Sequence, residues 1–587
     1  MADKNSLFNE AQALAAAGRW LDAVELWQRV IALGSRDPQA YRNLGLSLAQ
    51  AGQWSQAIEA YATAHEYGLA ADELYVGLGL VFSLRNQFDI AQENLETALR
   101  CNPENLAAWS NLIVAYARQG QWQKSQAAAN HLLGLQPDSP AALSALASAH
   151  GLNGEADSAI RLFRQVLAGS PHRVDDASNL LWAMLHSDRV SAQDILAEAR
   201  AFEARLPPAE ALPPPLAARS NKLRIGWVSA DLRRHPVGLF VIPMLACFDA
   251  NRCEHFVYDN ATLPDAFSEQ AKTQVRAWHA IAALGDDAVA ALIRQDGIDV
   301  LIDLSGHTAG NRLPLFARKP APVQISWLGS TGTTGIRAMD YILVPSDPVL
   351  LRGEWCSEQA VAVDLPGCHC VRQASQIFAG DSTQHPFERN GRISFGCLNN
   401  FRKVSPGCVA AWSRILHRVP DSRLFLAVNS QDERYFDIVN QRFAEHGIAR
   451  ERLHILANIS SEEYHARFRD IDIALDPFPC NGGTTTFDTL FAGVPLICLA
   501  GDALHSRMSA TIVSPLGLDE LVADSIDDYV DKAVRLAEST PALKGMRQSL
   551  PARVRQSPLT DLPGFARALE NLLHQLHAAG HRQDAAV

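Results

Sequence analysis

Residues 473–494 read IALDPFPCNGGTTTFDTLFAGV, which is an apolar run, a loop rich in proline and glycine, and a helical run. The short run Ile473–Leu475 is typical of a buried strand, and Thr489–Val494 is typical of a helix. Gly482 and Gly483 between them allow the backbone to come close to a ligand. The stretch therefore predicts a strand–loop–helix unit of a parallel α/β sheet, with its loop at the carboxyl end of the strand.

The loop carries groups that suit a diphosphate. Thr484, Thr485 and Thr486 stand at the expected start of the helix, where N–H groups, hydroxyls and the helix dipole favour an anion. Asp488 lies one turn further on and can accept hydrogen bonds from a ribose. A plain Gly-Gly turn with a threonine N-cap is the alternative interpretation, but the segment DPFPCN (476–481) is more elaborate than a cap requires.

Similar short apolar runs alternate with helical stretches from residue 222 onward, which predicts parallel α/β units. The first set of expected strands is 223–229, 255–259, 300–304, 323–328 and 341–344, and the second set is 393–397, 423–428, 452–456, 473–475 and 496–499. The polar segment 372–392 between the sets shows no clear element. We therefore predict one Rossmann-like domain over 222–380 and another over 391–575, with a ligand in the cleft between them.

Other loops also follow expected strands. LNNFRK (398–403) ends in Lys403, which can neutralise a departing phosphate, although the spacing alone favours an ordinary surface lysine. DLRRHPVG (231–238) places His235 in a strand-to-helix loop, where active-site residues often lie, although a lone histidine is more often structural. GSTGTTG (329–335) predicts a flexible loop.

The first third of the chain is a repeat. Gly18, Gly52, Asn86, Gly120 and Gly154 share a period of 34 residues, and an aromatic residue follows each of the first four two positions later. Gly or Asn permits the left-handed turn between two antiparallel helices, and the pattern resembles the tetratricopeptide repeat (TPR). We predict an α-solenoid of about five repeats with capping helices over 4–206, followed by a proline-rich linker over 207–221. Such a solenoid offers a concave surface for a peptide or protein, while a dimerisation surface or a spacer remains the alternative.

Composition limits the function classes. The net charge of 52 − 64 = −12 makes general binding to nucleic acid or to anionic membrane unexpected. No GxGxxG follows a strand and no GxxxxGK[ST] occurs, which disfavours dinucleotide oxidoreductases and NTPases. The longest apolar run, 237–248, is too short to span a bilayer, and the polar N-terminus lacks a signal-peptide core. Ten scattered cysteines without a CxxC pair fit free thiols, so we expect a cytoplasmic protein.

Four segments together are specific. DLRRHPVG, GHTAGNRLPLFARKPAPVQISWLGSTGTTG, LNNFRK and DPFPCNGGTTTFD follow one another behind the repeats. With them the chain resembles the O-linked N-acetylglucosamine (O-GlcNAc) transferase family over roughly residues 4–575. The resemblance implies a GT-B fold, with inverting, metal-independent transfer of N-acetylglucosamine from UDP-GlcNAc to Ser or Thr hydroxyls of proteins. It implies no cofactor beyond the donor substrate, and protein or peptide acceptors along the concave face of the solenoid.

Matched segment by segment, the resemblance assigns roles to individual residues. Lys403 corresponds to the lysine that stabilises the UDP leaving group, and His235 to a histidine once proposed as the general base; a substrate phosphate or a water chain can take the proton instead. The remaining residues implied to bind the donor are His307 near the sugar, Asn400 near the phosphates, Tyr464 and Arg467 beside the uracil, Cys480, Gly483, Thr484 and Thr485 around the diphosphate, and Asp488 at the ribose.

The sequence departs from the animal pattern of this family. Gly483 and Tyr464 each stand where a histidine is expected, Ser461 replaces a lysine, and Asn400 is shorter than the usual glutamine. We expect these changes to affect UDP binding or the preference for a sugar. Two other hypotheses are open at this point: a UDP-sugar transferase with a different sugar or a glycan acceptor, and a non-catalytic repeat scaffold with a relict catalytic region.

Overall fold

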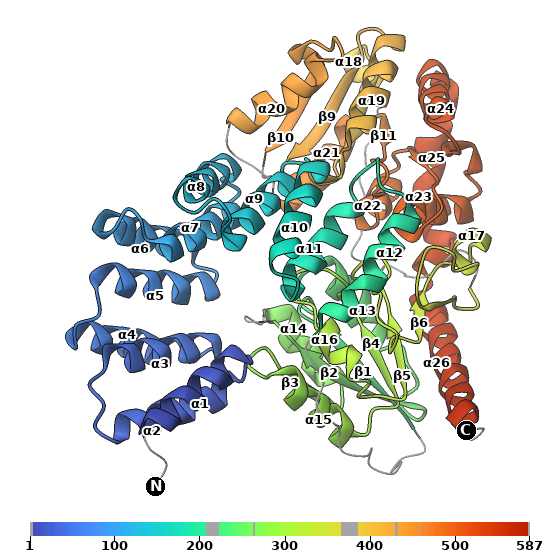
Figure 1. The fold of residues 1–587 in the computed structure, drawn as a ribbon. Coiled ribbons are helices and arrows are strands. Elements are labelled where there is room, and N and C mark those ends of the chain that lie inside the picture. The colour runs from blue at the N-terminus through green and yellow to red at the C-terminus, as the bar shows by residue number, and fades with distance from the viewer. Residues whose placement is uncertain are drawn as a thin grey trace.

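The computed structural model describes residues 4–206, 222–261, 265–365, 385–428, 433–457 and 460–584. A curved array of helices leads into two lobes that each contain a parallel sheet (Figure 1). This confirms the predicted α-solenoid followed by two Rossmann-like α/β domains, while the linker predicted at 207–221 lies outside the described residues. Among the helices described, none has both the length and the apolar character that crossing a bilayer requires.

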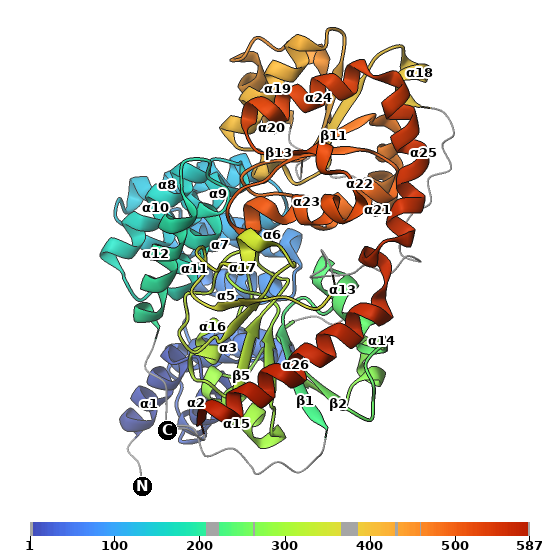
Figure 2. The same cartoon turned by 90° about the vertical axis from the view of Figure 1, so that its right-hand side faces the viewer.

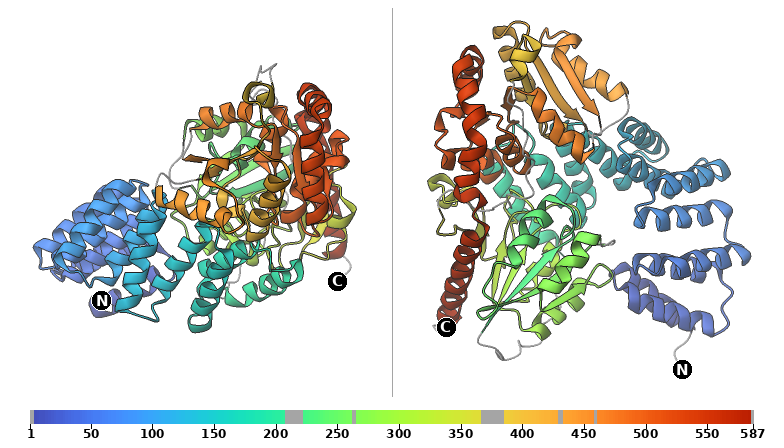
Figure 3. Two further views of the ribbon diagram at one scale, coloured as in Figure 1. Left: turned by 90° about the horizontal axis from the view of Figure 1, so that it is seen from above. Right: turned by 180° about the vertical axis from the view of Figure 1, so that it is seen from behind.

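The solenoid consists of five helix pairs and two capping helices. The pairs are α1 (Lys4–Ala16) and α2 (Trp20–Ala32), α3 (Pro38–Gln50) and α4 (Trp54–Glu66), α5 (Ala71–Leu84) and α6 (Phe88–Cys101), α7 (Leu106–Arg118) and α8 (Trp122–Leu135), and α9 (Pro140–Leu152) and α10 (Ala156–Gly169), followed by α11 (Val174–Met184) and α12 (Ala192–Phe202). The turns between paired helices use left-handed backbone, with φ of 74° at Gly18 and 57° at Asn86. Asn86 therefore fills the missing glycine position, as the repeat pattern predicts. Figure 3 shows the array extending to one side of the lobes.

The first lobe has a seven-stranded sheet in the order β3-β2-β1-β4-β5-β6-β7, and every adjacent pair is parallel. Its strands are β1 (Leu223–Ser229), β2 (Cys253–Asp259), β3 (Ala277–Ala280), β4 (Val300–Asp303), β5 (Val323–Ser326), β6 (Tyr341–Leu343) and β7 (Gln359–Val361), and its helices are α13 (Pro236–Leu245), α14 (Ala266–Ala271), α15 (Asp286–Asp296), α16 (Leu313–Ala317) and α17 (Pro348–Leu351). The edge strands β3 and β7 were not expected from the sequence. Both are short and only partly buried, so neither carries the apolar run that marks a central strand.

The second lobe has a six-stranded parallel sheet in the order β10-β9-β8-β11-β12-β13. Its strands are β8 (Ser394–Cys397), β9 (Arg423–Val428), β10 (Leu453–Ala457), β11 (Ile473–Leu475), β12 (Leu496–Leu499) and the two-residue β13 (Val522–Ala523), and its helices are α18 (Pro386–Asn390), α19 (Pro406–Arg418), α20 (Glu433–Ala444), α21 (Ser461–Arg467), α22 (Thr484–Phe491), α23 (Leu504–Val513), α24 (Ile526–Glu538) and α25 (Thr540–Gln556). Helix α18 falls inside the segment 372–392, where the sequence pattern predicts no element. A capping box between His385 and Glu388, with Pro386 at the first helical position, accounts for it.

The last helix, α26 (Leu562–Asp584), returns to the first lobe. Figure 2 shows it crossing that lobe in front of β1 and β5. Phe565 stacks on Trp327 with ring centroids 6.1 Å apart, and Glu570 accepts the backbone N–H of Asp249 at 3.0 Å. The start of α26 falls within the domain predicted over 391–575, but the helix packs on the first lobe.

The solenoid is seated on the glycine-rich loop 329–335. A Cβ atom at Gly335 would lie 1.9 Å from the carbonyl oxygen of Ala199 on α12, so only glycine allows this approach. The carboxylate of Glu358 accepts the Thr333 hydroxyl at 2.6 Å and the Thr334 N–H at 2.6 Å. The sequence predicts a flexible loop here, but these contacts hold it as a docking surface for the capping helices.

Candidate functional site

Several of the expected functional residues lie in loops at the carboxyl ends of four strands. His235 follows β1 and His307 follows β4, while Lys403 follows β8 and the segment 476–483 follows β11. The strands β1 and β4 are neighbours, and so are β8 and β11, at the point where each sheet reverses its strand order. Ligands of doubly wound folds bind at such switch points.

Lys403 contacts the glycine–threonine loop directly. It ends the short 3-10 helix Phe401–Lys403, which Asn400 caps by accepting the N–H of Arg402 at 3.2 Å. The Lys403 Nζ donates to the carbonyl oxygen of Asn481 at 2.6 Å. The structure thus brings Asn400, Lys403 and the loop of Cys480 and Gly483 together, although the two segments are some 80 residues apart in the chain.

The backbone of the 476–483 loop requires glycine at position 482 but not at position 483. A Cβ atom at Gly482 would lie 2.6 Å from the Thr486 hydroxyl and 2.9 Å from a carboxylate oxygen of Asp476, so a side chain does not fit. At Gly483 the nearest atom would be the Met508 side chain at 4.0 Å, which leaves room for one. Gly483 has no side chain to cap α22, so the first N–H groups of this helix remain for a ligand or water.

Asp476 lies beneath the loop and is fully buried. One carboxylate oxygen accepts the N–H of Gly482 at 3.0 Å, and the Ser509 hydroxyl also interacts with this carboxyl group. Burial raises the pKa of Asp476 to about 7, although the Ser509 hydroxyl, the Gly482 N–H and the charge of Lys403 oppose this shift. The carboxyl group is therefore partly protonated near neutral pH.

Tyr464 and Asp488 meet on the other side of α22. The Tyr464 hydroxyl donates to the Asp488 carboxylate at 3.1 Å, and its ring packs edge-on against Phe468 at 5.3 Å. Arg467, half-exposed on the same helix as Tyr464, pairs with Asp470 at 3.6 Å. The residues expected to bind uracil and ribose thus lie on α21 and α22, which contact each other through Tyr464 and Asp488. Arg467 is held by its ion pair with Asp470.

His235 caps the N-terminus of α13. Its Nδ1 accepts the N–H of Val237 over a long 3.4 Å and lies 3.8 Å from a carboxylate oxygen of Asp231. Burial lowers the pKa of His235, against the opposing effect of Asp231. Helix α13 packs on α22 across the two lobes, because the rings of Phe240 and Phe487 lie 5.7 Å apart. The helix that begins after His235 therefore contacts the helix that begins at Thr484.

His307 is held inside the protein. Its Nδ1 lies 3.0 Å from the Ser178 hydroxyl, its Nε2 lies 3.0 Å from the carbonyl oxygen of Thr334, and its ring packs edge-on against Phe202. Burial lowers its pKa to about 4. The structure thus places His307 between the capping helices of the solenoid and the 329–335 loop, with both ring nitrogens engaged.

The end of the solenoid forms part of the Lys403 region, which the sequence did not indicate. Trp182 lies under the guanidinium of Arg402, 5.4 Å from it, and Asp188 accepts the N–H of Gly407 at 2.7 Å. His186 is buried and donates from Nδ1 to the carbonyl of Trp182 at 2.8 Å. Burial, reinforced by the charge of Arg402, lowers the pKa of His186 to about 3, so it stays neutral. No motif marks these residues, because their role depends on how two distant segments pack.

The two lobes also meet away from these loops. Arg507 on α23 pairs with Asp347 before α17 at 2.9 Å. A cavity of about 490 Å³ beside this ion pair is lined by residues of both lobes and contains none of the expected site residues. The candidate site is therefore defined by the strand-end loops rather than by this cavity.

Comparisons with known proteins identify the family of the chain. Residues 208–360 and 373–569 match the family Glycosyl transferase family 41, and residues 8–71 and 84–149 match tetratricopeptide repeat families. A Solanum lycopersicum protein named "Probable UDP-N-acetylglucosamine--peptide N-acetylglucosaminyltransferase SPINDLY" is 32% identical over 366 residues, which are 60% of this chain and 38% of that protein. The Caenorhabditis elegans UDP-N-acetylglucosamine--peptide N-acetylglucosaminyltransferase is 25% identical over 474 residues, covering 61% of this chain and 41% of its own.

A solved structure covers more of the chain. A mutant of the Thermobaculum terrenum O-GlcNAc transferase superposes with a TM-score of 0.81 at 26% identity, over 88% of this chain and 99% of that one. The chain spans about two fifths of the curated plant and animal relatives named above. The similarity to the bacterial protein therefore extends over both solenoid and lobes, whereas the similarity to the longer relatives is partial.

Proposed function

Since the chain belongs to glycosyl transferase family 41, we propose that it transfers N-acetylglucosamine from UDP-GlcNAc to Ser or Thr hydroxyls of proteins, with inversion and without a metal. The observation that carries this proposal is the 2.6 Å hydrogen bond from Lys403 to Asn481, because it joins a cation to the loop at the start of α22. The names of the tomato and nematode relatives support the donor and the acceptor class.

The donor diphosphate binds between Lys403 and the first turn of α22 in this proposal. The ammonium group of Lys403 has three donors, one of which already contacts the loop, so two remain for phosphate oxygens. The N–H groups of Thr484 and Thr485 add the partial positive charge of a helix N-terminus. As the anomeric C–O bond breaks, negative charge grows on the departing UDP, and both elements stabilise it without rearrangement.

The nucleoside lies beside Tyr464 and Asp488. The Tyr464 hydroxyl holds the Asp488 carboxylate at 3.1 Å, which orients that carboxylate to accept a ribose hydroxyl. The tyrosine ring can stack on uracil, as an aromatic side chain in the histidine's place allows. Arg467 reaches the base if it exchanges its contact with Asp470.

His235 orients the reactants in this mechanism rather than accepting the proton. The Val237 N–H points at Nδ1, so the proton of the neutral ring is on Nε2 and this atom is a donor. The acceptor hydroxyl attacks the anomeric carbon on the face opposite UDP, and a phosphate oxygen of the donor takes the hydroxyl proton. A new glycosidic C–O bond replaces the bond to UDP, which gives inversion.

Acceptor proteins bind along the concave face of the solenoid. The net charge of −12 is unsuited to general nucleic-acid or membrane binding, so protein partners in the cytoplasm fit the proposal best. Ser178 on α11 contacts the first lobe and Asp188 after α11 contacts the second, so this end of the solenoid is joined to both lobes beside the proposed donor site.

UDP binding tests the site. We expect Lys403→Ala and Asp488→Ala each to weaken UDP binding at least about tenfold, since each removes a charged group that contacts the ligand. Isothermal titration with UDP measures this, and Lys544→Ala on α25, a half-exposed lysine of the same lobe that pairs with Glu388, is the matched control. Unchanged UDP affinity in both site variants would remove the site assignment.

Labelled UDP-sugars and a host lysate test the reaction. We expect label from UDP-GlcNAc on proteins, lost in Lys403→Ala. Label that appears only in glycan, or only from another donor, would favour a transferase of a different specificity. Tight protein binding with no UDP affinity would instead identify a scaffold.

A further inference from the structure

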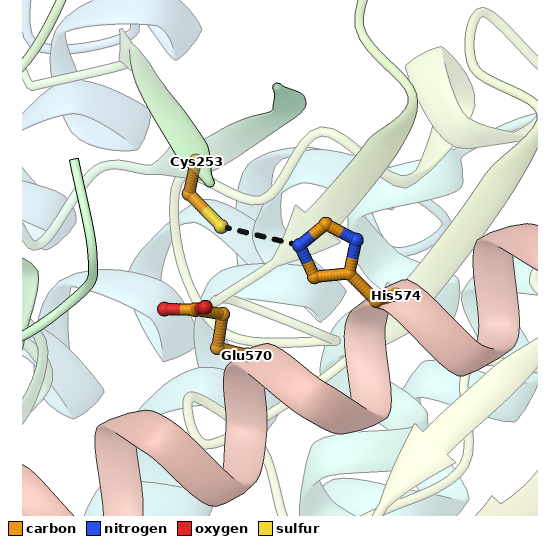
Figure 4. Close-up of side chains that lie close together, drawn as sticks. All are labelled: Cys253, Glu570 and His574. Atoms are coloured by element: carbon orange, nitrogen blue, oxygen red, sulfur yellow. Dashed lines mark hydrogen bonds between the residues drawn. The ribbon is translucent and has the colours of Figure 1, made fainter. Parts of the chain in front are cut away.

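Three side chains with metal-binding atoms lie together where α26 crosses the first lobe (Figure 4). Cys253 begins β2, and Glu570 and His574 lie one turn apart on α26. Their ligand atoms all lie within 4.8 Å of one another, and the Cys253 sulfur is 3.9 Å from Nε2 of His574. The cluster lies at the amino end of β2, whereas the candidate donor site lies at the carboxyl ends of the strands.

We propose that Cys253, Glu570 and His574 bind a divalent transition-metal ion of the zinc class, which fastens α26 to the first lobe. Thiolate and imidazole are the ligands that zinc prefers, and a carboxylate is a common third ligand. In a tetrahedral zinc site a sulfur and a nitrogen ligand lie about 3.6 Å apart, close to the separation of Cys253 and His574. The i, i+4 spacing of Glu570 and His574 puts both on one face of α26.

Neighbouring groups hold the Glu570 carboxylate in place, as outer partners hold the carboxylate ligands of metal sites. One oxygen of Glu570 contacts the guanidinium of Arg252 at 2.6 Å, and the other accepts the N–H of Asp249 at 3.0 Å. Each oxygen has two lone pairs, so these contacts leave one on each for a metal. Metal-binding carboxylates are usually held by such outer partners.

The burial and the charge of the Cys253–Glu570–His574 cluster also suit a divalent ion of the zinc class. Cys253 and Glu570 are buried and His574 is half-buried, so an ion can enter from the side of His574. On binding, the S–H bond of Cys253 breaks, a sulfur–metal bond forms and the proton passes to the solvent. The thiolate and the carboxylate then offset two of the three positive charges of the ion and Arg252, and a water molecule completes four ligands.

Zinc titration of the full chain tests the proposal. The protein is first treated with a chelator and then titrated with Zn²⁺ against a chromogenic indicator. We expect one ion per chain, and binding at least about 100-fold weaker in Cys253→Ser and in His574→Ala, beyond what the loss of an outer partner usually causes. Cys247→Ser, which changes a partly buried free thiol of the same lobe, is the control and should keep the affinity.

Two further measurements separate a ligand role from a packing role. Co²⁺ bound to the wild type should show a thiolate charge-transfer band that Cys253→Ser lacks. Zn²⁺ should raise the melting temperature of the wild type and of Cys247→Ser, but not of Cys253→Ser or His574→Gln. Absence of stoichiometric binding, or equal binding by the wild type and the ligand variants with unchanged circular dichroism, overturns the proposal. UDP affinity should not change on metal removal, so this outcome is distinct from failure of the proposed function.

Discussion

Single residues show how the loop between β11 and α22 is held in place. Asp476 is a buried carboxyl group that holds the N–H of Gly482, while Lys403 holds the carbonyl of Asn481 from above. A carboxylate in this position costs folding free energy, because burial disfavours its charged form. The loop geometry is thus maintained at some cost in stability, as is common at functional sites.

Asp476→Asn should raise the free energy of unfolding above that of the wild type at pH 8, and should change it little at pH 4. The pKa of about 7 in the folded protein lies above the ordinary value of 3.8. The folded state therefore binds more protons than the unfolded state between these values, and stability falls as the pH rises through them. A shift of this size corresponds to at most about 4 kcal/mol, at about 1.4 kcal/mol per unit.

Urea unfolding across pH 4 to 8 measures this difference. Asp437→Asn, at an exposed ion pair on α20, serves as the control and should show no such pH dependence. A constant difference between Asp476→Asn and the wild type at all pH values would contradict the assignment of the shift to Asp476.

At the scale of elements, the end of α11 supports the loop that carries Lys403. Trp182 lies under Arg402, and Asp188 accepts the first N–H offered by α19. Arg442 on α20 also donates to the carbonyl of Asn153 at 3.0 Å. The solenoid is therefore a structural support for the loop of the second lobe that carries Lys403.

Trp182→Ala should lower donor affinity or turnover by about fivefold to thirtyfold, since a desolvated cation–π contact contributes about 1 to 2 kcal/mol. Trp182→Phe should retain most of the function, because its ring still lies under Arg402. Trp54→Ala removes a similar contact with Arg85 elsewhere in the solenoid and is the matched control. UDP titration and steady-state kinetics give the result, and equal losses in Trp182→Ala and Trp54→Ala would rule out a positioning role.

At the scale of the whole molecule, the two lobes share one continuous cluster of buried apolar side chains, whereas the first repeats have their own. Phe240 meets Phe487 between the lobes, and Phe565 of α26 meets Trp327. Because α26 belongs to the end of the chain but packs on the first lobe, we expect the lobes to unfold together.

Phe565→Ala should destabilise both lobes by about 3 to 5 kcal/mol, the usual cost of truncating a buried phenylalanine. Hydrogen exchange should show faster opening in both sheets and unchanged protection in α1 to α4. Leu21→Ala, at a largely exposed position of the solenoid, is the control. Faster exchange confined to α26 would show that the lobes do not unfold as one unit.

The sequence by itself determined the repeat, the central strands and the loops that follow them, because period, apolar runs and glycines act locally. Gly18, Asn86 and the strand before Asp476 illustrate this. The sequence did not reveal the short edge strands β3 and β7, helix α18, or the packing of α26 on the first lobe. Partly buried strands and packing between distant segments leave no periodic signal in the sequence.

The same division holds for the candidate site. Lys403, Asp488 and the threonines of α22 could be selected from motifs, and their roles remain predictions. Only the tertiary structure decided the contact of Lys403 with Asn481 and the placement of His307 against the solenoid. It also decided that Trp182 and His186 lie in the Lys403 region. The physical reason is that a burial cost or a hydrogen bond between residues far apart in the chain exists only once the lobes and solenoid have packed.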